Sequence, residues 1–101
     1  MRQKSQIQEK TLAKKLNGRI TINSGATTDF DKADVESEHF LIECKTTDKK
    51  SYSLKKTILE KIEREANFKN KIPLMEIEIG TKKYIVSRED DFFAMLDEYY
   101  Q

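Results

Sequence analysis

The chain has 101 residues, of which 37% are apolar and 37% charged, and its formal net charge is +1. This length fits one small domain with a modest core, and no apolar stretch approaches the roughly 20 residues that a membrane-spanning helix needs. The single cysteine, Cys44, excludes an internal disulfide and fits a reducing compartment, so we expect one cytoplasmic domain over residues 1–101.

The first half of the chain predicts a helix, a strand and a hairpin. Helical periodicity runs over residues 4–17 and ends at an Asn-Gly pair, a common helix stop. A short strand is predicted over 19–23, followed by a loop over 24–32 that is rich in Ser, Gly, Thr and Asp. Two strands over 33–37 and 39–45 form a tight hairpin. The second strand is the more apolar, which predicts a central place in the sheet.

The second half adds two helices and two strands. A helix is predicted over 53–68, with Ser51 or Ser53 as its N-cap. Then follow strands over 74–79 and 83–87 and a last helix over 89–99. The order helix, three strands, helix, two strands, helix predicts an α/β domain, in which helices flank a small mixed sheet of about five strands.

The charges are unevenly distributed although their sum is small. Residues 1–20 carry six Lys or Arg against one acid, and residues 45–56 carry five lysines against one acid. The last thirteen residues carry five acids and no Lys or Arg. Either a basic face meets a polyanion or these are ordinary solvated helix faces, and charge alone favours the second interpretation.

The pattern Asp34-x₈-Glu43-x-Lys45 is the most informative part of the sequence. Glu43 and Lys45 lie two apart in a strand, so they project from one face while Cys44 points into the core. Asp34 lies on the neighbouring strand of the hairpin, so its carboxylate and that of Glu43 can converge on one ion. Because Mg²⁺ keeps several waters, two carboxylates and the Cys44 carbonyl would suffice as its protein ligands. Lys45 would orient a water or take its proton in phosphodiester hydrolysis. The alternative is an exposed hairpin with paired charges, since short charged patterns recur by chance.

Two further charged residues occupy apolar positions. Glu9 precedes Leu12, Ala13 and Leu16 at helical spacing, so it lies on the apolar stripe of the first helix. A carboxylate there needs a partner, which a metal or its water shell would provide, unless the helix is rotated or frayed. Lys55 falls within the apolar arc of the second helix. It would reach the scissile phosphate or only extend its stem along the core.

Three segments of this sequence resemble PD-(D/E)xK nucleases. They are Ser24-Gly25-Ala26, Lys32-Ala33-Asp34-Val35 and Leu41-Ile42-Glu43-Cys44-Lys45-Thr46-Thr47, the last followed by a lysine-rich helix. The likeness is greatest to archaeal-type Holliday junction resolvases and their small phage-encoded relatives. It runs from about Glu9 to Ala66, and its specific part is Glu-Cys-Lys-Thr with an aspartate at the matching distance.

The resemblance implies a restriction-endonuclease-like core and a role for each matched residue. Glu9 is similar to the acid of the first helix, Ser24 to the serine of a loop that approaches the cleaved strand, and Lys45 to the motif lysine. Asp34 and Glu43 are similar to the metal-binding acids. Members are homodimers that cut two strands with Mg²⁺ or Mn²⁺. One departure is an alanine before the acid, where proline or glycine is common, and the chain is short with few surplus bases, which leaves junction specificity open.

The leading hypothesis is a homodimeric, Mg²⁺-dependent endonuclease that acts on branched DNA. The alternatives are a nickase or restriction-type nuclease on duplex or single strands, and a non-catalytic DNA-binding protein with the same fold. Basic residues expected to hold the DNA backbone are Lys10, Lys14, Lys15, Arg19, Lys49, Lys50, Lys55 and Lys56. Apolar residues of the last helix, which form either core or half of a dimer interface, are Phe92, Phe93, Leu96, Tyr99 and Tyr100.

Overall fold

The computed structural model describes residues 4–21 and 33–100, and within them it contains the predicted elements in the predicted order. The elements are α1 (Lys4–Lys15), β1 (Arg19–Ile20), β2 (Val35–Glu36), β3 (Phe40–Thr47), α2 (Lys56–Lys69), β4 (Ile72–Ile79), β5 (Lys82–Ser87) and α3 (Glu89–Tyr99). The α/β fold class is therefore confirmed. Ser24, which the resemblance matched to the serine of a loop that approaches the cleaved strand, lies outside the described residues.

The five strands form one sheet in the order β1-β2-β3-β4-β5, so β3 is central, as its apolar sequence predicted. The β3 and β4 strands are parallel, with Phe40 opposite Ile72 and Thr47 opposite Ile79, whereas the other pairs are antiparallel. Parallel neighbours need a long crossover, and α2 supplies it. The sheet is therefore mixed.

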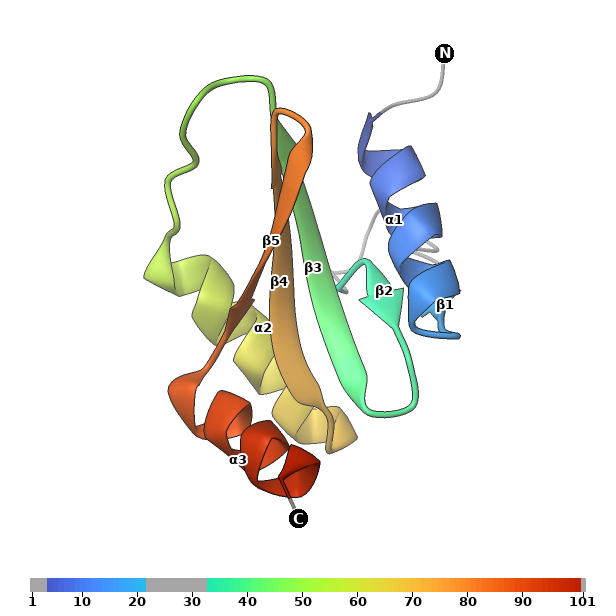
Figure 1. The fold of residues 1–101 in the computed structure, drawn as a ribbon, viewed down its shortest axis with the longest axis vertical. Coiled ribbons are helices and arrows are strands. Elements are labelled where there is room, and N and C mark those ends of the chain that lie inside the picture. Colours follow the sequence, from blue (N-terminus) through green and yellow to red (C-terminus); the bar gives the residue numbers. More distant parts are fainter. Residues whose placement is uncertain (1–3, 22–32, 101) are drawn as a thin grey trace.

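Helices α1 and α2 cover opposite faces of this sheet (Figure 1). Ile42 and Cys44 pack with Leu12 of α1, which confirms that Cys44 points into the core. Leu41, which points the other way from β3, packs with Ala66 of α2. This alternation is the period of two that a strand imposes, and it puts Glu43 and Lys45 on the α2 face.

The predicted end of α1 is a Schellman motif. Asn17 has a φ of 53°, and the N–H groups of Asn17 and Gly18 donate to the carbonyls of Lys14 and Ala13 at 3.3 and 2.8 Å. A Cβ at residue 18 would lie 2.4 Å from the Glu36 carbonyl oxygen, so this close approach of α1 to β2 requires glycine. The Asn-Gly pair thus both ends the helix and lets the chain enter the sheet.

The predicted start of α2 was wrong. The helix begins at Lys56 with extended Lys55 as its N-cap, and neither serine caps it. Tyr52 is partly buried against the core cluster that includes Ile62 and Met75, which anchors the connection from β3 before the helix begins. Leu54, which the predicted helix over 53–68 included, consequently lies before the helix and is 45% exposed.

Helix α3 buries none of its side chains within the protomer. Phe92 is 48% exposed, Phe93 52% and Tyr99 79%, so the apolar stripe of α3 is not part of the core of a single chain.

No helix among the described residues is both long and apolar enough to cross a bilayer.

Candidate active site

Asp34 lies immediately before β2 and is held by β3. Its N–H donates to the Ile42 carbonyl at 3.0 Å, and its carbonyl accepts from the Thr21 N–H at 3.0 Å. Its side-chain Oδ2 accepts a hydrogen bond from the Cys44 N–H at 2.8 Å. Backbone and carboxylate are thus both fixed, which places Asp34 beside the strand that carries the other motif residues.

Glu43 and Lys45 project from the same face of β3, as the sequence pattern predicted. Lys45 Nζ lies 3.4 Å from Glu43 Oε2, and the two side chains are 36% and 13% exposed, respectively. The charge of Asp34 acts on both Glu43 and Lys45. The structure therefore brings all three motif side chains to one partly buried corner.

Burial disfavours the charged forms of both acids, and the charge of Asp34 adds to this effect at Glu43. The pKa of Asp34 is raised by burial, although the Cys44 N–H and Lys45 act in the opposite direction. The pKa of Glu43 is raised by burial and by the charge of Asp34. Burial lowers the pKa of Lys45, but the charge and hydrogen bond of Glu43, together with the charges of Tyr52 and Asp34, outweigh burial and raise it. In the protein alone Lys45 is therefore an ammonium group between two acids, and the lowered lysine pKa considered for a metal-loaded site does not apply to this state.

Glu9 approaches the same corner from α1. It is partly buried, and both burial and the charge of Asp34 raise its pKa. The fully buried polar residue of α1 is its neighbour Gln8, which is only 1% exposed. Glu9 therefore lies at the border of the apolar stripe of α1, near Asp34, and Gln8 lies within the stripe.

Gln8 connects α1 to the motif strand, a role that the sequence analysis missed. Its Nε2 lies 3.2 Å from the Lys45 carbonyl, the Glu76 carbonyl and Glu76 Oε1. Gln8 is four residues before Leu12 on one helix face, so helical periodicity was the signal that could have identified it. This amide fixes the backbone at Lys45 from the face opposite to its side chain.

One polar stripe of α2 lines the corner from the sheet face opposite to α1, the face from which Glu43 and Lys45 project. Lys61, Glu65 and Lys69 follow one another at i, i+4 and i+8. The charge of Lys61 lowers the pKa of both Asp34 and Glu43, and Glu65 Oε1 accepts a hydrogen bond from the Ala33 N–H at 2.9 Å. The sequence-based predictions for this helix concerned its apolar face and the lysines at its start, so this stripe was missed.

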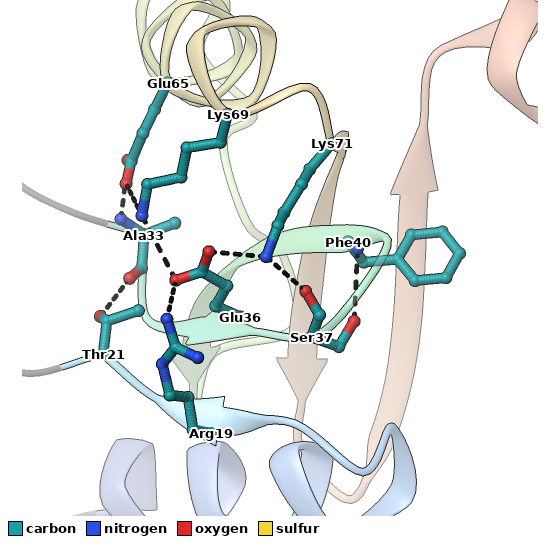
Figure 2. A network of polar contacts seen from close by, with 9 residues as sticks. All are labelled: Arg19, Thr21, Ala33, Glu36, Ser37, Phe40, Glu65, Lys69 and Lys71. Atoms are coloured by element: carbon teal, nitrogen blue, oxygen red, sulfur yellow. Dashed lines mark hydrogen bonds and ion pairs between the residues drawn. The ribbon is translucent and has the colours of Figure 1, made fainter.

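A second polar cluster, which we call the Glu36 network, lies next to this corner (Figure 2). Glu36 is 5% exposed and accepts hydrogen bonds from Arg19 at 3.0 Å, Lys69 at 3.3 Å and Lys71 at 2.7 Å. Lys71 also donates to the Ser37 carbonyl at 2.6 Å. The hydrogen bonds and charges of Lys71 and Lys69 lower the pKa of Glu36. This network joins β1, β2 and the residues at the end of α2.

The donor set of the corner fits Mg²⁺. In residues 4–21 and 33–100, no three side chains from His, Cys, Asp and Glu lie close enough to hold a metal together, so a cation here would be held by fewer acids, such as Asp34 and Glu43. The N–H and carbonyl of one residue point to the same side of a strand, so the Cys44 carbonyl is directed toward Asp34. One or two carboxylates, a carbonyl and retained waters are what Mg²⁺ binds.

The remaining predicted residues lie on the surface or in the core. Every basic residue proposed for DNA binding is exposed: Lys10, Lys14, Lys15, Arg19, Lys49, Lys50, Lys55 and Lys56. Of these, Arg19 is paired with Glu36, with 73% of its side chain exposed. The Cys44 thiol is buried and its pKa is raised by that burial, which argues against a nucleophilic role.

The fold is that of a known resolvase. The structure of Hjc, a Holliday junction resolvase from the archaeal hyperthermophile Archaeoglobus fulgidus, superposes with a TM-score of 0.63 at 15% sequence identity, and the match covers 80% of this chain and 73% of that one. The fold expected from the sequence resemblance is therefore confirmed. No protein-family model matches the sequence, and no curated protein matches it significantly.

Proposed function

We propose that this protein is a Mg²⁺-dependent endonuclease that cleaves branched DNA such as a Holliday junction, with Mn²⁺ as a substitute metal. The observation that carries the proposal is the gathering of Asp34, Glu43 and Lys45 at one corner of the sheet. The resolvase fold supports the same conclusion at the level of architecture. A fold alone does not define an activity, so the site carries the argument.

Each residue of the corner has a task in hydrolysis of a phosphodiester. Asp34 Oδ1, Glu43 and the Cys44 carbonyl would hold the cation, while Asp34 Oδ2 keeps its bond to the Cys44 N–H. The bound cation supplies neutralisation of phosphate charge and a more acidic water. The Lys45 ammonium would donate to the attacking water or to a phosphate oxygen, which it can do while it remains close to Glu43. Glu9 would act through a water, because no three acids of the described residues lie close enough to share one cation.

The exposed basic residues would bind the DNA backbone on both sides of this corner. Lys10, Lys14 and Lys15 lie along α1, and Lys49 and Lys50 follow β3. Contacts of this kind release counterions from DNA, so binding should weaken steeply as salt rises. Arg19 would contribute less than a free arginine, since Glu36 neutralises part of its charge.

A homodimer would provide the second site that symmetric cleavage of two strands requires. The exposed aromatic side chains of α3, together with Tyr84 and Ile85 of β5, are 48% or more exposed. Several large apolar side chains that are exposed in one chain are commonly covered by a partner. A two-fold axis between two chains would place their two active sites at a fixed distance. We therefore assign the dimer interface to the exposed aromatic surface of α3.

The test is to incubate the protein with a four-way junction, linear duplex and single-stranded DNA, each with Mg²⁺ and with EDTA. We expect Mg²⁺-dependent cleavage of the junction alone. Cleavage of duplex or single strands at a similar rate would indicate a nickase or restriction-type enzyme instead. Binding of DNA without cleavage in any metal would contradict the nuclease proposal and favour a non-catalytic DNA-binding protein.

A further inference from the structure

The peptide group before Asp34 is buried and needs hydrogen-bond partners. Ala33 is 1% exposed, so an unsatisfied N–H at this position would be costly. β2 begins only at Val35, so the Ala33 N–H lies outside the ladder. A side chain from another element must therefore satisfy it.

Glu65 of α2 is that partner. Its Oε1 accepts from the Ala33 N–H at 2.9 Å, and the Thr21 hydroxyl donates to the Ala33 carbonyl (Figure 2). The residue before Asp34 is therefore held through its N–H by α2 and through its carbonyl by Thr21. Alanine at position 33 has the backbone N–H that donates to Glu65, whereas proline at this position would have none.

Glu65 is itself fixed. Its side chain is only 20% exposed, and Oε2 lies 3.8 Å from Lys69 Nζ. Lys69 in turn lies 3.3 Å from Glu36 Oε1, which connects Glu65 to the Glu36 network. The acceptor at Ala33 is thus part of a chain of contacts and has little freedom to rotate away.

We propose that Glu65 is a positioning residue: by accepting the Ala33 N–H it holds Asp34 where the carboxylate can bind a divalent cation, and this acceptor oxygen, more than its charge, is what the site uses. The inference rests on the proposed function. The Ala33 N–H is a neutral donor that needs an acceptor oxygen, and the side-chain amide of a glutamine offers the same oxygen without the charge.

The test compares Glu65→Ala, which removes the acceptor, with Glu65→Gln, which keeps an acceptor oxygen and removes the charge. Mn²⁺ affinity is measured by electron paramagnetic resonance of free Mn²⁺, and exchange of the Ala33 amide by NMR without metal. We expect Glu65→Ala to weaken Mn²⁺ binding roughly tenfold and to accelerate amide exchange by about the same factor or more, as for other residues that orient metal ligands. Glu65→Gln should remain within about threefold of the wild type in both measurements.

Glu60→Ala, an exposed acid on the same helix, is the matched control and should change neither quantity. Equal losses in Glu65→Gln and Glu65→Ala would overturn the inference, because charge would then be what matters. Wild-type values in Glu65→Ala would overturn it as well. A wild-type protein that neither binds Mn²⁺ nor cleaves DNA would overturn the proposed function and this inference together. If the wild type binds Mn²⁺ and cleaves DNA but the Glu65 variants behave otherwise than expected, only the inference fails.

Discussion

The Cys44 N–H donates a hydrogen bond to Asp34 Oδ2 over 2.8 Å, so the strand that carries Glu43 and Lys45 also orients the first carboxylate. One oxygen of Asp34 accepts this bond, and the other would take part in holding a cation. The carboxylate is therefore oriented in the protein alone, which lowers the conformational cost of binding a cation there.

Asp34→Asn should abolish cleavage while DNA binding survives. The amide oxygen of asparagine can still accept the Cys44 N–H, so the corner keeps its shape and loses only one negative charge. We expect the cleavage rate to fall roughly 100-fold or more, with wild-type affinity for a junction in Ca²⁺ measured by gel shift. Glu60→Gln, an exposed change on α2, is the control. Near wild-type cleavage in Asp34→Asn would contradict the assignment of the site.

The same substitution should stabilise the fold at neutral pH. The pKa of Asp34 is raised above its ordinary value of 3.8, so the folded protein favours the protonated form. Stability from this group is fully present below pH 3.8 and is lost as pH rises through the higher folded pKa. The amide of the variant imitates the protonated acid at every pH. In EDTA, Asp34→Asn should therefore be more resistant to urea than the wild type at pH 7, and the two should converge as the pH falls below the ordinary value.

Lys45→Ala should also remove cleavage without removing DNA binding. Lys45 Nζ is the cation 3.4 Å from Glu43, and no other lysine on β3 can replace it. We expect a loss of roughly 100-fold or more in the rate of junction cleavage, with the affinity for the junction nearly unchanged. Lys83→Ala on β5, an exposed lysine far along the sheet from β2, should leave the rate unchanged. A variant at position 45 that cuts at the wild-type rate would exclude this lysine from the chemistry.

The sequence predicted the fold and the motif because both depend on local periodicity. Glu43, Cys44 and Lys45 alternate across a strand, so their directions follow from the strand itself. Helical periodicity could have placed Gln8 on the buried face of α1, but it could not have identified the partners of Gln8 and Glu65. Each acts on a backbone group distant in sequence, Gln8 on the Lys45 carbonyl and Glu65 on the Ala33 N–H. The serine caps failed for a related reason, because the core contact of Tyr52 decided where α2 begins.

Glu36→Gln should destabilise the protein by about 1–3 kcal/mol at pH 7, because Arg19, Lys69 and Lys71 lose their shared carboxylate. The loss is not larger because these cations are partly exposed and water screens their charges. The pKa of Glu36 is lowered from 4.5, so its contribution is present above this value and is lost as pH falls through the lower folded pKa. The difference between variant and wild type, measured by urea denaturation, should therefore narrow in acid. Glu38→Gln, with its side chain 87% exposed, should have little effect at any pH. A Glu36→Gln protein as stable as the wild type at pH 7 would show that the network is energetically neutral.

Phe93→Glu should convert a dimer into a monomer. Phe93 is 52% exposed in the protomer and packs edge to face with Phe92 at 5.4 Å between ring centroids, so an apolar pair is presented to the outside of α3. A charge on this surface would be buried without a partner in a dimer, whereas in a monomer it would be solvated. Sedimentation equilibrium should give the mass of two chains for the wild type and of one for the variant, with a thermal midpoint that changes little.

Ile7→Glu is the matched control for this change, since Ile7 is 53% exposed on α1 and should leave the mass unchanged. The Phe93→Glu variant should also nick one strand of a junction and no longer cut two strands together, because each monomer carries one corner formed by Asp34, Glu43 and Lys45. A Phe93→Glu protein that sediments as a dimer, or a monomeric wild type, would place the second site elsewhere. If the monomer still cut both strands symmetrically, the link between the α3 surface and paired cleavage would be lost even with the active site intact.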